Sequence, residues 1–401
     1  MTWLEILVLA IKCIVLALAS TSLFAYFTLF ERRLLARFQH RVGPNRAGAI
    51  PIGGGRTVLG GWLQPAADAI KLFFKEDIVP VMADKWVYII SPGFALIPAL
   101  IIWVALPLGY WPDGNGGNLL QLAEIEVAVL YLLAVTGLGV YGIAIAGWAS
   151  NNKYSMLGGV RASAQVISYE LALSLAVLGV VMQAQTFRTD TIVAEQAIGI
   201  WNIIPQLLAF AIFMVASTAE VVRAPFDLVE AEQELVGGYN TEYGSMKFAL
   251  FFMSEYVKLI AMNAIAVTLF LGGWHLPGME ALNVWAVAQF GAPIGNAVLG
   301  FVSLGAFLMK VTILSFVSVW LRATLPRVRY DQLMDLGWKV LLPLALVNVA
   351  ATAVIGVLVP DNVWLSGALG FAVGVIALAV LGFRNRDRST RSGVTLVKKQ
   401  A

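Results

Sequence analysis

The sequence contains almost none of the residues that hold metals or redox centres. It has one cysteine, Cys13, which lies in an apolar run, and two histidines, His40 and His275. These counts exclude a disulfide framework, a cysteine-ligated iron–sulfur cluster, a zinc site and a bis-histidine haem held by this chain alone. Any electron-transfer centre that serves this protein must therefore lie on a partner.

Charged residues are also scarce. They make up 13% of the chain, hydrophobic residues make up 59%, and the net charge is only +3. The basic residues gather near the ends of apolar runs, so binding to nucleic acid has no support. A phosphate-binding loop is excluded too, because Gly53-Gly54-Gly55 lacks the preceding strand, the spacing and the Lys-Ser/Thr pair of such loops.

Long apolar runs dominate the chain, and each is near the length of about 20 residues that a helix needs to span hydrocarbon. They predict an all-α polytopic membrane protein. The first run carries Glu5 and Lys12 and ends in Glu31-Arg32-Arg33, which distinguishes it from a cleaved signal peptide. We expect a single membrane domain over 1–383, a basic cytoplasmic tail over 384–401, and about nine transmembrane helices at residues 3–30, 86–108, 123–148, 163–184, 200–220, 247–271, 296–321, 336–358 and 362–383.

The loops between these runs alternate in their content of lysine and arginine. The loop after the first run and the tail are rich in both, whereas residues 109–122 and 272–295 contain neither. Because cytoplasmic loops carry the excess of lysine and arginine, the pattern predicts an N-terminus outside and a C-terminus in the cytoplasm. The loop over 221–246 is then cytoplasmic.

A short amphipathic helix is predicted over residues 64–76, in the first cytoplasmic loop. Pro65 stands at a suitable first helical position. Polar residues Gln64, Asp68, Lys71 and Lys75 lie along one face, and the apolar residues Ala66, Ile70, Phe73 and Phe74 lie largely opposite. Such a helix lies on the membrane surface or covers a cavity.

Carboxylates are crowded into one cytoplasmic loop. Of the 24 in the chain, six lie between residues 220 and 242, with Arg223 as the only cation among them: Glu220, Asp227, Glu230, Glu232, Glu234 and Glu242. If 225–235 is a helix that begins at Pro225, then Asp227, Glu230 and Glu234 share a face and Glu232 points elsewhere. Repulsion and partial burial would raise their pKa values, which suits proton uptake and release. The alternative is a solvated acidic loop that docks on a basic partner.

Three glutamates lie within or at the end of predicted membrane helices, at similar depth from the cytoplasmic side: Glu170, Glu220 and Glu255. An ionisable group in a spanning helix is costly and usually marks an ion or proton path. Together with the acidic loop, these glutamates predict a chain of protonatable sites that leads into the membrane. The alternative is a set of structural ion pairs with Lys258 or with loop arginines. Lys258 lies one turn from Glu255 and could neutralise it.

Aromatic and methionine residues near the acidic loop could line an apolar chamber for a flat lipophilic molecule. They are Phe226, Phe252 and Met253. Residues of these types are more often ordinary packing. The arginines that follow the first helix are likewise expected at any anionic membrane surface.

Several blocks of sequence carry a family resemblance. They include Arg-Val-Gly-Pro-Asn-Arg (41–46), Arg-Ala-Pro-Phe-Asp-Leu-Val-Glu-Ala-Glu-Gln-Glu-Leu-Val-Gly-Gly-Tyr (223–239) and Leu-Pro-Arg-Val-Arg-Tyr-Asp-Gln-Leu-Met (325–334), together with 63–72, 147–155, 161–170, 242–243 and 248–256. In this order they resemble the H subunit of bacterial proton-pumping NADH:quinone oxidoreductase, respiratory complex I. Its mitochondrial equivalent is NADH dehydrogenase subunit 1.

The resemblance implies a membrane subunit at the joint of the membrane arm and the peripheral arm, with no redox centre of its own. Quinone is the implied substrate, and FMN and the iron–sulfur clusters lie on partner subunits. The implied partners are the peripheral-arm quinone-site subunits, the terminal iron–sulfur subunits, the small membrane subunits, the antiporter-like subunits and membrane lipid. The implied location is the bacterial plasma membrane.

The resemblance also implies roles for individual residues. It assigns an acidic channel between the quinone chamber and the antiporter-like subunits to Glu170, Glu220, Glu230, Glu232, Glu234 and Glu255, and we add Asp227 to this relay. It assigns the chamber or its entrance to Arg33, Arg41, Asp68, Lys71, Phe226 and Phe252, and we add Arg223 and Met253.

Some features depart from the family pattern. Val221-Val222 replaces a common Thr-Asn pair, Ala49–Thr57 looks like an insertion, and the ninth helix with its tail is additional. Two other functions stay open. One is the equivalent subunit of a membrane-bound hydrogenase-type complex; the other is a stand-alone proton or cation transporter, although the inverted repeats and broken helices of transporters are not evident.

Overall fold

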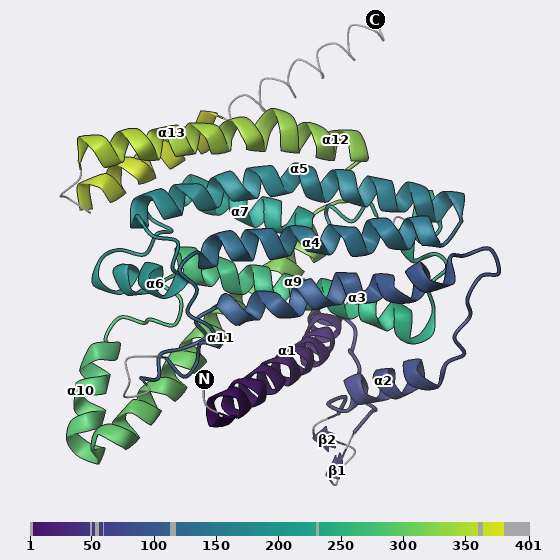
Figure 1. The fold of residues 1–401 in the computed structure, drawn as a ribbon, viewed down its shortest axis with the longest axis horizontal. Coiled ribbons are helices and arrows are strands. Elements are labelled where there is room, and N and C mark those ends of the chain that lie inside the picture. The colour runs from purple at the N-terminus through teal and green to yellow at the C-terminus, as the bar shows by residue number, and fades with distance from the viewer. Residues whose placement is uncertain are drawn as a thin grey trace, which may run out of the picture.

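The computed structural model describes residues 3–48, 50–52, 56–58, 60–112, 118–229, 232–359 and 364–380. In chain order its helices are α1 (Trp3–Phe38), α2 (Gln64–Phe74), α3 (Lys85–Ile101), α4 (Ala128–Ala149), α5 (Lys153–Ala184), α6 (Thr189–Ile198), α7 (Leu207–Glu220), α8 (Glu232–Leu235), α9 (Ser245–Phe270), α10 (Met279–Phe290), α11 (Ala292–Thr324), α12 (Tyr330–Leu336) and α13 (Leu342–Leu358). Most long helices run side by side, and α1 crosses below them (Figure 1).

Seven of the described helices are long and apolar enough to cross a membrane: Leu7–Phe38, Lys85–Ala105, Ala128–Ala149, Lys153–Ala184, Ser245–Phe270, Pro293–Thr324 and Tyr330–Leu358. Two shorter apolar helices, Leu207–Glu220 and Trp364–Val380, add to them. The prediction of an all-α polytopic membrane protein is therefore confirmed. The orientation of the chain across the membrane and the tail 384–401, which lies outside the described residues, stay predictions.

The observed helix bounds differ from the apolar runs where polar residues continue a helix. Helix α5 begins at Lys153, well before the predicted 163, and the side chain of Asn152 caps it by accepting a hydrogen bond from the Tyr154 amide at 2.9 Å. An apolar run marks the hydrocarbon-crossing part of a helix and not its polar ends. For the same reason α6 and α10, which lie in loops between runs, were not predicted.

Small residues let the central helices approach closely. Helix α5 packs on α4, α7 and α13 (Figure 1). A Cβ at Gly142 of α4 would lie 2.5 Å from the Ala95 nitrogen of α3, and a Cβ at Gly158 of α5 would lie 2.7 Å from the Tyr239 nitrogen. Glycine at such points permits backbone-to-backbone packing in a membrane bundle. The second contact fixes the end of the acidic loop against α5.

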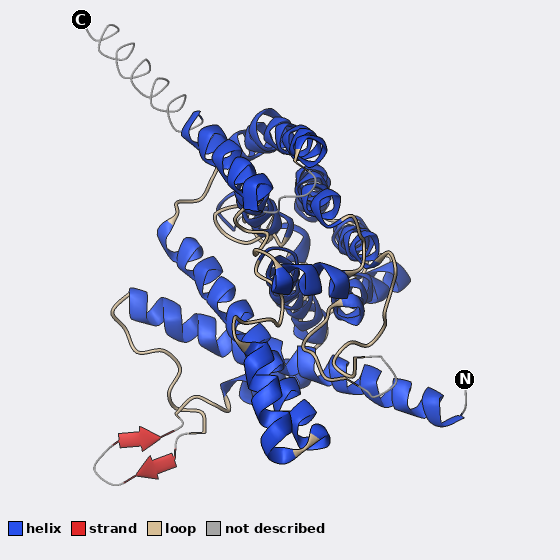
Figure 2. Ribbon diagram, turned by 90° about the vertical axis from the view of Figure 1, so that its left-hand side faces the viewer, coloured by secondary structure: helices blue, strands red, loops and turns tan. Residues whose placement is uncertain are grey.

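A two-stranded hairpin was not expected from the sequence. Strands β1 (Ile50–Ile52) and β2 (Arg56–Val58) pair antiparallel, extend one residue beyond the predicted insertion 49–57, and stand apart from the bundle (Figure 2). Ala49 and Gly53–Gly55 lie outside the described residues. The insertion therefore extends the region next to α2 and leaves the helical core unchanged.

The predicted amphipathic helix is confirmed as α2, with proline in its first turn and no buried residue. Its apolar side chains point away from the bundle, since Ile70, Phe73 and Phe74 are 59%, 68% and 81% exposed. That face fits a membrane surface or a partner.

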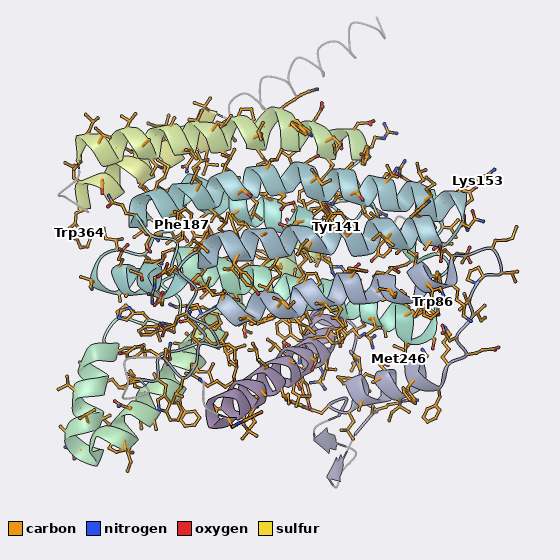
Figure 3. All side chains as sticks on the ribbon, in the orientation of Figure 1. Trp86, Tyr141, Lys153, Phe187, Met246 and Trp364 are labelled. Carbon is orange, nitrogen blue, oxygen red and sulfur yellow. The ribbon has the colours of Figure 1, made fainter. Side chains whose placement is uncertain are left out.

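Labelled side chains distinguish the two ends of the bundle. Trp86, Lys153 and Met246 lie toward one end, and Phe187 and Trp364 lie toward the other (Figure 3). In the predicted orientation the first end is cytoplasmic, and we name it the loop end. The second, which also carries α6, is named the outer end.

Candidate functional site

The acidic loop does not form the helix that the sequence predicted over 225–235. Of the described residues between 225 and 235, only Glu232–Leu235 (α8) is helical. Backbone carbonyls of the preceding residues bind groups from other segments. The Gln165 side chain donates to the Phe226 carbonyl at 2.9 Å, the Val328 amide donates to the Pro225 carbonyl at 3.1 Å, and the Arg327 guanidinium binds the Asp227 carbonyl. These acceptors are occupied by tertiary partners, so the loop follows the surface of α5 and residues 327–328 instead of coiling.

Asp227 and Glu234 consequently do not share a helix face. Glu234 lies at the surface and pairs with Arg161 of α5 at 2.9 Å, with its side chain 49% exposed. The Asp227 side chain has one buried oxygen, Oδ1, without a hydrogen-bond partner among the described residues. Glu230 lies outside the described residues, and of Glu232 only the backbone is described. The prediction that Asp227 and Glu234 lie on one helix face is thus wrong, and the place of Glu230 stays a prediction.

Two of the helix-borne glutamates form buried ion pairs, and the first is Glu220. It is 1% exposed at the end of α7, and its Oε1 lies 3.0 Å from Nζ of Lys258 on α9. Lys258 also donates a hydrogen bond to the Thr136 carbonyl of α4 at 3.2 Å. Lys258 therefore neutralises Glu220, whereas the sequence had suggested that it neutralises Glu255.

Glu255 is held by the only arginine of the acidic loop. It is 8% exposed, its Oε2 lies 3.6 Å from Nη2 of Arg223, and its Oε1 accepts a hydrogen bond from the Tyr239 hydroxyl at 2.9 Å. The guanidinium lies over the rings of Tyr256 and Phe252, 3.8 and 5.7 Å from their centroids. Burial favours loss of the Arg223 proton, but Tyr256, Glu255 and Glu31 raise its pKa, so the guanidinium stays charged.

The third glutamate, Glu170 of α5, reaches α4 at a glycine. A Cβ at Gly137 would lie only 2.4 Å from the Glu170 Oε1, so a side chain there would displace the carboxylate. Glu220 and Lys258 are the charged groups that act on Glu170. We name Glu170, Glu220, Arg223, Glu255 and Lys258 the buried charge cluster. It joins α4, α5, α7 and α9 to the acidic loop.

A buried carboxylate about two turns before the end of α1 was not predicted from the sequence. Glu31 is 4% exposed and pairs with Arg322 at the end of α11. Its charge acts on both Arg223 and Tyr256, so it lies next to the buried charge cluster. Glu31 and Arg322 each follow an apolar run, and charged residues at such positions are expected at any membrane surface. The sequence therefore gave no reason to single out this pair. Tyr239 gave no signal of its own.

The predicted chamber residues fall into two groups. Phe226, Phe252, Met253 and Arg223 lie at the inner side, where Phe226 is 7% exposed and its ring centroid lies 6.1 Å from that of Tyr169. Asp68 joins α2 to α1, because it accepts from Arg32 at 2.7 Å and from Gln64 at 2.9 Å.

The remaining chamber residues lie nearer the surface. Arg33 binds the Gly60 carbonyl, Arg41 binds the Gln39 side chain at 2.7 Å, and Lys71 is exposed. An apolar cleft of about 180 Å³ between α1, α9 and α11 is lined by Phe27, Phe30, Ile260 and Val311, among others, and by none of the predicted chamber residues. Arg41 and Lys71 are exposed, so they do not lie with the inner group of predicted chamber residues.

The chain matches the family model described as NADH dehydrogenase over residues 11–353. It belongs to the NADH dehydrogenase family. A relative from Geobacter sulfurreducens, named as an H subunit of NADH-quinone oxidoreductase, is 47% identical over 343 residues, which cover 82% of this chain and 90% of that protein. Relatives with the same subunit name include one from Deinococcus deserti, 47% identical over 94% of this chain and 91% of its own, and one from Deinococcus radiodurans, 44% identical over 94% and 92%.

The resemblance to the H subunit is therefore confirmed. This NADH dehydrogenase family member is a multi-pass membrane subunit of an oxidoreductase complex. The names of these relatives lend no support to a hydrogenase-type complex or to a stand-alone transporter.

Two glycines of α4 give a matched test of the position of Glu170. Replacement of Gly137 by alanine is expected to lower NADH:quinone turnover several-fold, because the new Cβ would lie 2.4 Å from Oε1 of Glu170 and displace it. Gly139→Ala is the control, since its Cβ would meet Nζ of Lys258 at an ordinary 3.9 Å. The measurement is NADH:quinone turnover of the Gly137→Ala and Gly139→Ala variants, in membranes that contain equal amounts of this subunit. Equal turnover of both variants would show that the position of Glu170 has no bearing on the reaction.

Proposed function

We propose that this chain forms the quinone-access chamber of a proton-translocating NADH:quinone oxidoreductase and couples quinone reduction to proton translocation through its buried carboxylates. Arg223 carries this proposal. Its guanidinium contacts the rings of Tyr256 and Phe252, which would form the aromatic wall of the chamber, and a buried carboxylate, Glu255. It is thus placed to sense charge in the chamber and to pass the change to the membrane interior.

The charge balance of the cluster supports proton transfer. Three carboxylates, Glu170, Glu220 and Glu255, face two cations, Arg223 and Lys258. Full ionisation therefore leaves one negative charge in excess within the bundle. A buried excess charge is costly, and one bound proton removes it.

The proposed coupling begins with competition for Arg223. Negative charge that develops on the quinone attracts the guanidinium and weakens its 3.6 Å pairing with Glu255. Glu255, still bound by the Tyr239 hydroxyl, then takes up a proton more readily. Lys258 lies one turn further along α9 and holds Glu220, so a change of charge at Glu255 alters the balance between Glu220 and Glu170 as well.

The remaining parts of the proposal follow from the family. FMN and the iron–sulfur clusters would lie on partner subunits, and the peripheral-arm quinone-site and terminal iron–sulfur subunits would dock at the loop end. The small membrane and antiporter-like subunits would receive the charge change, and the complex would lie in a bacterial plasma membrane. Among the described residues, no group of three or more His, Cys, Asp or Glu side chains could hold a metal ion.

Glutamine variants at Glu220 and Glu234 test the relay. Glu220→Gln is expected to reduce proton pumping and quinone turnover together, at least tenfold, since it removes a fully buried charge from the cluster. Glu234→Gln is expected to have a smaller effect, because Glu234 is half exposed and paired with Arg161 at the surface. The measurements are quinone reduction and acidification of the lumen in inverted membrane vesicles.

Asp335→Asn is the control for these variants, since Asp335 forms an exposed pair with Lys339 and lies outside the cluster. Normal pumping and normal quinone turnover in both Glu220→Gln and Glu234→Gln would rule out the relay. Reduced turnover in all three variants would point to assembly defects instead.

A further inference from the structure

The outer end of the bundle contains a large cavity that the proposed coupling does not use. It has a volume of about 630 Å³ and lies between the ends of α5, α6 and α13 and the start of α7. Glu220 ends α7 at the opposite, loop end, and the other cluster residues on these helices, Glu170, Glu255 and Lys258, lie near the middle of α5 and α9. The cavity is therefore a separate feature of the fold.

The charge of the cavity wall is negative. Among the described residues that line it, Glu195 of α6 is the only charged one, and none of the salt bridges in the described part of the chain includes it. The C-termini of α5, α6 and α13, with their free carbonyl groups, lie at the cavity. The N-termini of α7 and of the helix Trp364–Val380 lie there too. The partial negative charges of the three helix C-termini and the partial positive charges of the two N-termini thus cancel in part. The charge of Glu195 remains, so the cavity is electrostatically complementary to a positively charged group.

Side-chain amides supply hydrogen-bond acceptors to this wall. Asn202 is 6% exposed, its Nδ2 donates to the Leu269 carbonyl at 2.9 Å, and its Oδ1 accepts no hydrogen bond from another described residue. Gln183 lines the cavity as well, and its Oε1 receives only a long contact of 3.4 Å from Gln206. Both oxygens can accept a further hydrogen bond from a molecule in the cavity, so the wall suits a ligand with N–H groups.

The rim of the cavity has the composition of a lipid-facing surface. Ile198, which lines it, is 87% exposed, and the neighbouring Trp364 and Phe187 are 74% and 43% exposed. Both aromatic residues lie at the outer end of the bundle (Figure 3). Exposed aromatic rings at the ends of membrane helices lie at the level of lipid headgroups.

We propose that this cavity binds the headgroup of a phospholipid with a primary ammonium, as in phosphatidylethanolamine. The ammonium pairs with Glu195 and donates to Asn202 Oδ1, and the glycerol and acyl parts lie against Ile198, Ile200 and Ile355 at the rim. The Thr186 hydroxyl, whose oxygen already accepts from the Arg188 amide, is free to donate to the phosphate. A quaternary ammonium offers no N–H donor, and an anionic headgroup would meet Glu195, so both bind less well.

Retention of lipid by the intact complex tests this site. The complex is reconstituted in vesicles of equal parts phosphatidylethanolamine, phosphatidylcholine and phosphatidylglycerol, extracted and washed in detergent, and its retained lipids are measured by mass spectrometry. The wild type should hold phosphatidylethanolamine in preference to the other two. Glu195→Gln should weaken this preference about tenfold, because it removes one charge-assisted hydrogen bond.

A second variant fills the cavity without straining the fold. Gly356 lines the cavity, and a Cβ there would meet nothing within 4 Å, so Gly356→Leu should expel the headgroup. Asp190→Asn is the matched control, because it removes a carboxylate from the same helix as Glu195 that pairs with Arg188 and does not line the cavity. NADH:quinone turnover shows that each variant is assembled. Equal retention of the three lipids by the wild type, or undiminished phosphatidylethanolamine in Gly356→Leu, would overturn the proposal.

Discussion

Replacement of Lys258 by methionine is expected to reduce the amount of assembled complex and its resistance to heat. Methionine keeps much of the length and apolar volume of the lysine, but it leaves Glu220, which is 1% exposed, without its cation at 3.0 Å. Breaking a buried pair from one side costs about 3–5 kcal/mol, since the remaining charge is buried and uncompensated. The protein content of the membranes and the half-life of activity at raised temperature measure the effect.

The double variant Lys258→Met/Glu220→Gln distinguishes stability from coupling. It removes both charges, so assembly and heat resistance are expected to recover in large part. Proton pumping is expected to stay low, because the protonatable group at position 220 is absent. Lys339→Met, at an exposed pair with Asp335, serves as the control and should change stability by less than about 0.5 kcal/mol. A Lys258→Met complex as abundant and heat-resistant as the wild type would show that Glu220 carries no charge in the folded protein.

The spanning helices could be predicted because the membrane imposes one simple requirement on the sequence. Each helix must present enough apolar residues to cross the hydrocarbon, and this length is visible without any knowledge of neighbours. The same reasoning identified Glu170 and Glu255, since a charge inside such a run is costly and needs a reason. The ends of the helices were less predictable, as the early start of α5 at Lys153 shows, because caps such as Asn152 lie outside the hydrocarbon.

Partners of the buried charges could not be predicted from spacing. Lys258 is one turn from Glu255, which favours pairing on the surface of an isolated helix, but in the bundle its side chain reaches Glu220 on α7. Glu255 instead receives Arg223 from the loop and Tyr239 from the turn beyond it. These choices depend on how α7, α9 and the loop pack, and helical spacing describes only one helix at a time.

The backbone conformation of the acidic loop could not be predicted from local sequence either. Pro225 and the carboxylates that follow it are typical of a helix start, yet Gln165 and residues 327–328 occupy the carbonyls over 225–227. Buried tertiary hydrogen bonds outweigh a local helical preference of a few tenths of a kcal/mol per residue. The prediction of one protonatable helix face was wrong for this reason, and the helix-borne glutamates form the cluster instead.

Replacement of Arg223 by methionine is expected to abolish most quinone turnover. The variant loses the 3.6 Å pairing with Glu255 and the cation–π contacts to Tyr256 and Phe252. A buried, ionised Glu255 that has lost its cation costs about 3–5 kcal/mol unless it binds a proton, and a desolvated cation–π contact is worth about 2 kcal/mol. A protonated Glu255 can no longer respond to charge in the chamber, so a fall of about a hundredfold in turnover follows, equal to about 2.7 kcal/mol.

Arg223→Lys separates the role of the charge from that of the planar group. Lysine keeps one positive charge and is expected to preserve assembly, but a compact ammonium cannot both stack on Tyr256 and reach Glu255 as a guanidinium does. Turnover should therefore recover only in part. Tyr256→Phe keeps the aromatic ring over which the Arg223 guanidinium lies, whereas Tyr256→Leu removes it. Turnover should therefore be higher in Tyr256→Phe than in Tyr256→Leu. If Arg223→Lys restores full turnover and full pumping, a positive charge near Glu255 suffices, and the contact between Arg223 and the aromatic wall is packing that takes no part in coupling.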